Sequence, residues 1–100
     1  MGPLDEFIEQ VHREPYNLLV NNCLGKSSRI VRRARDLGHD ARLMACVAIV
    51  PRRPLPFVAP HFYAEVDGGI VDVAMDPAME AWVCRNEELV RLAPIEMPLN

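Results

Sequence analysis

The chain lacks the features that mark several classes of protein. It has no apolar run of about 18 residues, so we expect no membrane span. Its acidic N-terminus shows no signal-peptide pattern. Its cysteines are Cys23, Cys46 and Cys84, an odd number without a Cys-x-x-Cys pair, which fits neither a disulfide framework nor a zinc site. We therefore expect reduced thiols, a cytoplasmic location, and no metal or other cofactor.

An excess of positive charge is also absent. The formal net charge is −3, which argues against nucleic acid as the main partner. Four arginines lie between residues 29 and 35, and we expect them to form a solvated helix face rather than a phosphate-binding surface. One hundred residues, half of them apolar, predict a single domain over 1–100 with a real hydrophobic core. The oligomeric state stays open.

One segment, from Asn21 to Gly38, organises the chain. Its apolar and small side chains at 27, 30, 31, 34 and 37 follow three- and four-residue steps, which predicts a helix with that face buried. Asn21 or Asn22 can cap its start, and Gly38 can close its end. The first turn holds Cys23 instead of a carboxylate, and unpaired backbone N–H groups at a helix start lower a thiol pKa. Cys23 is therefore either a nucleophile or a small apolar residue on a helix face.

The segments around this helix predict a helix and a central strand. Residues 4–11 carry apolar side chains at helical spacing, which predicts a short amphipathic helix. Residues 41–50 are almost continuously apolar, which predicts a strand buried on both faces, with Cys46 packed inside it. The proline-rich residues 51–56 break regular structure and should form an exposed loop.

A β-hairpin is predicted in the second half of the chain. Residues 61–66 and 70–76 are joined by Asp67-Gly68-Gly69, and the glycines permit the positive φ angles of a tight turn. Beyond Pro77 we expect short elements only: a helical turn over 77–83, a capped helix over 86–89, and an edge strand or ordered tail over 93–100.

The hairpin supplies the groups that a cysteine nucleophile needs. A base must take the thiol proton, and a carboxylate must hold that base in one tautomer. His61 starts the first strand and Asp76 ends the second. If Gly68-Gly69 is a two-residue loop, these side chains stand opposite each other, about 5 Å apart at Cβ.

The same register disfavours the other aspartate of the hairpin. Asp72 would lie opposite Glu65, four positions from His61, or about 14 Å along the strand. A three-residue loop over 67–69 is the open alternative, and it would leave Asp76 diagonal to His61. The sequence thus favours Asp76 over Asp72 as the partner of His61.

Short motifs between residues 20 and 78 follow one another in a specific order. They are Asn22-Cys23-x-x-Lys26-Ser27, Leu37-Gly38-x-x-Ala41-Arg42-Leu43, His61-x-Tyr63-x-Glu65-Val66, Asp67-Gly68 and Val73-x-x-Asp76-Pro77. This order resembles the core of the bacterial and archaeal transglutaminase-like superfamily, which has a papain-like fold and a Cys-His-Asp triad. The resemblance implies Cys23 as nucleophile, His61 as base and Asp76 as orienting acid.

The chain departs from this family in three respects. Tyr63 stands where family members usually carry tryptophan, and most members have more structure before the cysteine. No obvious glutamine or tryptophan precedes Cys23 to complete an oxyanion hole. The candidates for that role are the backbone N–H of Cys23 and the side chain of Asn21 or Asn22.

We therefore expect a small α+β domain, in which the cysteine helix packs on an antiparallel sheet of three or more strands. The predicted function is thiol-dependent acyl transfer: Cys23 attacks a peptide, amide or ester carbonyl, and water or an amine resolves the thioester. A cysteine peptidase, an amidase and a transglutaminase-like acyltransferase all use this chemistry. The alternatives are a catalytically inactive binding module of the same fold and, more remotely, a regulatory protein that uses its arginine face.

Overall fold

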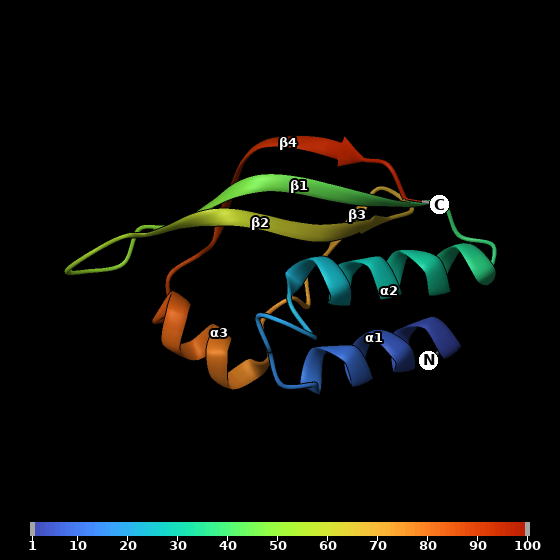
Figure 1. The fold of residues 1–100 in the computed structure, drawn as a ribbon, viewed down its shortest axis with the longest axis horizontal. Helices are drawn as coiled ribbons and strands as arrows, with labels where there is room; N and C mark the ends of the chain where they lie inside the picture. The colour runs from blue at the N-terminus through green and yellow to red at the C-terminus, as the bar shows by residue number, and fades with distance from the viewer. Residues whose placement is uncertain (1, 100) are drawn as a thin grey trace.

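The computed structural model describes residues 2–99 as one α+β domain. Its elements are, in chain order, α1 (Pro3–Arg13), α2 (Cys23–Asp36), β1 (Ala41–Val50), β2 (Phe57–Val66), β3 (Gly69–Val71), α3 (Pro77–Cys84) and β4 (Val90–Met97). The strands form an antiparallel sheet in the order β3-β2-β1-β4. The helices lie along one side of that sheet (Figure 1). The predicted α+β class is therefore confirmed.

Helix α2 begins and ends where the sequence predicts. Asn22 is its N-cap, and the side-chain oxygen of Asn22 accepts a hydrogen bond from the backbone N–H of Gly25 at 2.9 Å. Gly38 follows the helix with a φ of 88°, a left-handed conformation that glycine adopts without strain. The predicted buried stripe is present except at its last position, where Leu37 is exposed; its buried members are Ser27, Ile30, Val31 and Ala34.

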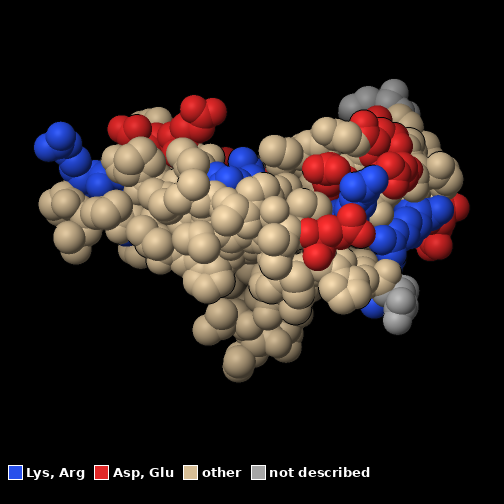
Figure 2. Space-filling view, turned by 90° about the horizontal axis from the view of Figure 1, so that it is seen from above, with Lys and Arg blue, Asp and Glu red and all other residues tan. Residues whose placement is uncertain are grey.

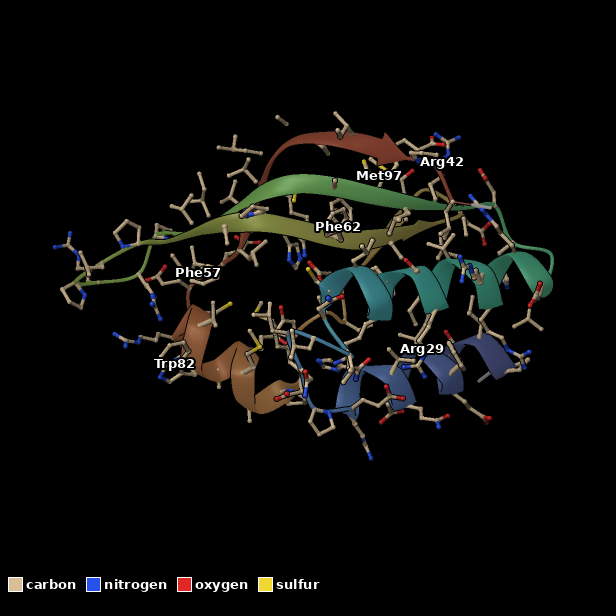
Figure 3. The ribbon with its side chains drawn as sticks, in the orientation of Figure 1. Arg29, Arg42, Phe57, Phe62, Trp82 and Met97 are labelled. Atoms are coloured by element: carbon tan, nitrogen blue, oxygen red, sulfur yellow. The ribbon has the colours of Figure 1, made fainter. Side chains whose placement is uncertain are left out.

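The arginines of α2 contribute to packing as well as to charge. Arg29 lies between α1 and α2 (Figure 3) and forms a two-pronged ion pair with Glu14, at 2.5 and 3.0 Å. The guanidinium groups of Arg29 and Arg33 each lie 5.9 Å from the centre of the Phe7 ring. Arg35 donates hydrogen bonds to two backbone carbonyls. These contacts tie α2 to its neighbours.

Strand β1 is central, as predicted, but the prediction that both of its faces are buried is wrong, because Arg42 and Val47 are exposed. It pairs with β2 along its whole length and with β4 on its other side. At one end of the sheet, Leu43 and Ala64 belong to the core that α1 and α2 cover. At the other end, Val50 packs against Val83 of α3. The sheet therefore buries apolar side chains under all three helices.

The hairpin turn differs from the predicted one. Val66 pairs with Gly69, so the two-residue loop is Asp67-Gly68, neither Gly68-Gly69 nor a three-residue loop. Asp67 and Gly68 both have positive φ, 50° and 83°, as a tight turn that matches the twist of the strands requires. Strand β3 ends at Val71, where the chain leaves the sheet. The predicted strand over 70–76 is therefore too long.

The C-terminal part of the chain confirms two predictions and contradicts one. The expected helical turn is α3, and the expected edge strand is β4, which starts earlier than predicted. The predicted helix over 86–89 is wrong, because Arg85 and Asn86 both have positive φ and reverse the chain. No helix within residues 2–99 combines the length and the apolar character needed to cross a bilayer.

Part of the sheet that no helix covers carries apolar side chains. Figure 2 shows the sheet side of the molecule, where the middle is largely uncharged and most charged groups lie toward the two ends. Branched aliphatic residues of three strands are partly exposed there, namely Val47, Val58, Val90, Leu92 and Ile95. The register places them on one face, since Val47 pairs with Leu92 and Ile49 pairs with both Val58 and Val90.

Candidate active site

Cys23 is the first residue of α2 and lies against a free edge of strand β2. Strand β3 pairs only with residues 64–66, so the backbone of Phe62 has no strand partner on that side. The side chain of Ser27 donates to the carbonyl oxygen of Phe62 at 3.2 Å. The backbone N–H of Phe62 donates to the sulfur of Cys23. The start of α2 is thus fixed to the sheet by Phe62.

His61 lies next to this contact and faces the thiol. Its ring is buried, with 7% of the residue exposed. It stacks on the ring of Tyr63, with the two ring centres 6.5 Å apart. Its Nε2 lies 2.7 Å from Oδ2 of Asp72, and the ring is close enough to the Cys23 thiol for each group to shift the pKa of the other. Because Nε2 is occupied by Asp72, Nδ1 is the ring nitrogen left for Cys23. The structure thus brings together a thiol, an imidazole and a carboxylate.

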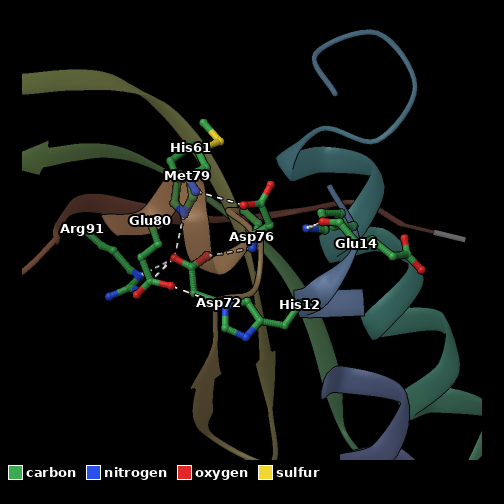
Figure 4. Close-up of polar contacts among 10 residues, drawn as sticks. His12, Glu14, His61, Asp72, Asp76, Met79, Glu80 and Arg91 are labelled. Atoms are coloured by element: carbon green, nitrogen blue, oxygen red, sulfur yellow. Dashed lines mark hydrogen bonds and ion pairs between the residues drawn. The ribbon is translucent and has the colours of Figure 1, made fainter. Parts of the chain in front are cut away.

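The carboxylate is Asp72, and the expectation that Asp76 contacts His61 is wrong. Asp76 is the N-cap of α3, and its Oδ1 accepts from the backbone N–H of Met79 at 2.9 Å. Its Oδ2 accepts from the backbone N–H of Tyr16 at 2.8 Å. Figure 4 shows His61 and Asp72 joined, with Asp76 bonded to the start of α3. Asp76 therefore holds backbone segments together.

The register explains the error. With Asp67-Gly68 as the loop, Ile70 rather than Asp72 pairs with Glu65. After Val71 the chain leaves the sheet, so the spacing of an extended strand no longer sets the distance from Asp72 to His61. The bend brings the Asp72 side chain back over β2.

Arg91 of β4 completes the cluster and was missed by sequence reasoning. Its Nε and Nη2 donate to Oδ2 of Asp72 at 3.2 and 2.8 Å, the same oxygen that His61 contacts. The side chain of Asp72 is only 9% exposed. The one signal in the sequence is that Arg91 interrupts the apolar segment 89–95.

These contacts favour an ion pair between the thiol and the imidazole. Burial acts to raise the pKa of Cys23, but hydrogen bonds from His61 and from the backbone N–H groups of Phe62 and Leu24 lower it overall. Burial acts to lower the pKa of His61, but Asp72 and Cys23 raise it to about 9. Both shifts favour the thiolate and imidazolium pair, the reactive form of a cysteine nucleophile.

The other two thiols lie in environments of the opposite kind. Cys46, paired with His61 across the strands, and Cys84, at the end of α3, are both buried. Burial is the main cause that raises the pKa of each. Of the three thiols, Cys23 is therefore the one whose pKa is lowered.

The predicted oxyanion-hole candidates differ in whether they have an N–H group left to donate. Asn21 donates both amide hydrogens elsewhere, to Oε1 of Glu14 at 3.2 Å and to the Pro15 carbonyl at 3.1 Å, so its assignment is wrong. Asn22 caps the helix with its oxygen and uses one amide hydrogen on a backbone carbonyl. The backbone N–H of Cys23, in the first turn of α2, has no helical partner. It and the remaining amide hydrogen of Asn22 can stabilise an oxyanion.

Lys26, one turn after the cysteine, has a structural role. It is completely buried, and its Nζ donates to the backbone carbonyl of Glu14 at 2.8 Å. Burial lowers its pKa, while the nearby carboxylates of Asp76 and Glu14 act in the opposite direction. Lys26 thus anchors the segment between α1 and α2.

A cavity of about 590 Å³ borders the acid end of this cluster. Asp72 and Arg91 line it, together with residues of α3 and of the segment before β4, whereas Cys23 is not among its lining residues. Within residues 2–99, no three His, Cys, Asp or Glu side chains are placed to share a metal ion.

No family model, curated protein or solved structure matches this chain. The transglutaminase-like resemblance therefore stays a prediction.

Proposed function

We propose that this chain is a thiol-dependent acyl-transfer enzyme of the transglutaminase-like type, with Cys23 as nucleophile, His61 as acid and base, and Asp72 as orienting carboxylate. One observation carries the proposal: a buried imidazole lies 2.7 Å from the Asp72 carboxylate and beside the Cys23 thiol, whose pKa it lowers. Nucleophile, base and orienting group in contact are the arrangement that cysteine-dependent acyl transfer requires.

The first half of the reaction acylates the enzyme. The Cys23 thiolate attacks the carbonyl carbon of a peptide, amide or ester, and the carbonyl oxygen becomes an oxyanion near the backbone N–H of Cys23. The His61 imidazolium gives its proton to the leaving nitrogen or oxygen, and the C–N or C–O bond breaks. The acyl group is left on Cys23 as a thioester.

The second half releases the acyl group. Neutral His61 takes a proton from water or an amine, which attacks the thioester carbonyl and displaces the Cys23 thiolate. Water gives hydrolysis and an amine gives transfer. Asp72 keeps the His61 ring in the orientation and tautomer that both halves need.

The burial of charge at this site supports an enzyme more than an inactive binding module of the same fold. A nearly buried carboxylate and imidazolium cost desolvation free energy, which apolar residues of similar size would avoid. Titratable groups that contact one another and have shifted pKa values are typical of functional sites, because catalysis needs pKa values matched to its task. The three free cysteines fit a reducing compartment such as the cytoplasm, which we include in the proposal.

The test is a screen of peptide, amide and activated ester substrates, followed by mass spectrometry of the protein. We expect an acyl adduct on Cys23 and turnover that disappears in Cys23→Ala. Cys84→Ser is the matched control, because it changes a buried thiol outside the triad, and it should retain turnover. Ligand binding without any Cys23-dependent adduct would favour the inactive module.

A further inference from the structure

Three donors converge on one oxygen of Asp72. His61 Nε2 lies 2.7 Å from Oδ2, and Arg91 reaches the same atom with Nη2 at 2.8 Å and Nε at 3.2 Å. The other oxygen has only a long contact, 3.4 Å, from the backbone N–H of Ala74. Figure 4 shows Arg91 and His61 approaching Asp72 together. Arg91 and His61 therefore share the charge of one carboxylate.

Arg91 reaches this oxygen from the far edge of the sheet. It lies on β4, where it pairs with Ala48 of β1, whereas Asp72 follows β3 at the opposite edge. Its guanidinium lies 5.3 Å from the centre of the Tyr63 ring, and that ring stacks on His61. Arg91, Tyr63 and His61 thus form one layer across the face of the sheet.

We propose that Arg91 is a positioning residue of the active site, which keeps Asp72 charged on the His61 ring and limits how tightly that carboxylate retains the imidazolium proton. This inference rests on the proposed function, because it concerns how His61 exchanges its proton.

The first part of the role follows from the burial of Asp72. During turnover His61 gives up its proton. Without Arg91, the Asp72 carboxylate, whose side chain is 9% exposed, would then be a nearly buried anion with a single neutral donor, His61. Arg91 is charged at every relevant pH and supplies two charge-assisted hydrogen bonds. Asp72 therefore stays ionised and in place through the cycle.

The second part follows from the sign of the charge on Arg91. A cation on the oxygen that holds His61 opposes the positive charge of the imidazolium and makes it a stronger acid. An imidazolium that is held too tightly protonates a leaving group poorly. The titratable and charged groups that face His61 come from five segments, namely Cys23 (α2), Cys46 (β1), Tyr63 (β2), Asp72 (after β3) and Arg91 (β4).

The test measures the pKa of His61 by NMR titration of its ring. The signals of that ring are identified by their absence from the spectrum of His61→Gln. In Arg91→Met we expect the pKa to rise by about 1 unit or more, a tenfold or larger change in the protonation equilibrium. Arg91→Gln keeps donors without the charge and should show the same rise if the methionine variant folds poorly. Arg91→Lys keeps the charge and should stay closer to the wild type.

Arg42→Met is the matched control, because Arg42 is also a sheet arginine and pairs with Asp40 and Glu96 instead of the site. It should leave the titration of His61 unchanged. An unchanged or lowered His61 pKa in Arg91→Met and Arg91→Gln would overturn the inference. An absent acyl adduct on wild-type Cys23 is a separate result, which would overturn the proposed function whatever the pKa of His61.

Discussion

Replacing Asp72 with asparagine should disable His61, whereas the same change at Asp76 should not. In the wild type, Asp72 and Cys23 raise the pKa of His61 from 6.5 to about 9 against the opposing effect of burial. That difference is equivalent to about 3 kcal/mol of preference for the charged ring. Because Asp72 supplies the larger of the favourable contributions, we expect Asp72→Asn to remove half of the difference or more.

The amide should keep these hydrogen bonds but lose the charge that holds the imidazolium. Arg91 only donates, so it will hold the amide oxygen in the place of Oδ2, the atom that His61 Nε2 also contacts. A neutral amide stabilises the charged His61 ring far less than a carboxylate does. The thiolate–imidazolium pair is then disfavoured, and we expect activity to fall by about 10-fold or more.

Asp76→Asn is the matched control. Asparagine is as good an N-cap as aspartate, so α3 should still form. One of the two hydrogen bonds, to Tyr16 or to Met79, will be lost, at a cost of about 1 kcal/mol in the free energy of unfolding. The pKa of His61, read by NMR, should stay near 9. A lowered His61 pKa in Asp76→Asn but not in Asp72→Asn would refute the assignment of the acid.

Three further outcomes follow from the same contacts. Limited alkylation with peptide mapping should label Cys23 before Cys46 and Cys84, and label found first on Cys84 would contradict the site. Cys23→Ser should unfold at the same denaturant concentration as the wild type yet lose turnover, because a hydroxyl is a far weaker nucleophile at neutral pH; retained turnover would exclude the covalent mechanism. Gly68→Ala should lower the free energy of unfolding by about 1 kcal/mol, because Gly68 has a φ of 83°, and an unchanged denaturation midpoint would contradict this conformation of the turn.

The elements with strong periodicity could be predicted from the sequence. The buried stripe of α2, the apolar run of β1 and the proline-rich loop after it each follow from local pattern alone. Cys23 at the start of α2 follows from the same pattern, since the N-cap at Asn22 fixes where the helix begins. His61 is correctly predicted to lie on the first strand of the hairpin, but it does not start that strand, because β2 begins at Phe57.

The identity of the acid could not be predicted, because it depends on the position of the turn, and moving the turn by one residue shifts the register of the strands by two. Moving the loop from Gly68-Gly69 to Asp67-Gly68 changes every cross-strand pair. The end of β3 at Val71 then frees Asp72 from the strand geometry. Sequence pattern fixes neither the turn type nor the point where a strand leaves its sheet.

The roles of Arg91 and Asn21 were out of reach for a different reason. Arg91 meets Asp72 across the whole sheet, and a contact between residues 19 positions apart leaves no local signal. The amide of Asn21 donates to Glu14 and to the Pro15 carbonyl instead of facing the thiol, because the fold of the segment before α2 brings these groups beside it. Both depend on tertiary packing.

The central claim is that His61 makes a reactive thiolate of Cys23. The rate of Cys23 alkylation by iodoacetamide, measured against pH in the wild type and in His61→Gln, tests it most directly. We predict that wild-type Cys23 still reacts well below the ordinary thiol pKa of about 8.5, and that His61→Gln loses this low-pH reactivity. Two superimposable profiles that both follow an ordinary thiol would contradict the account.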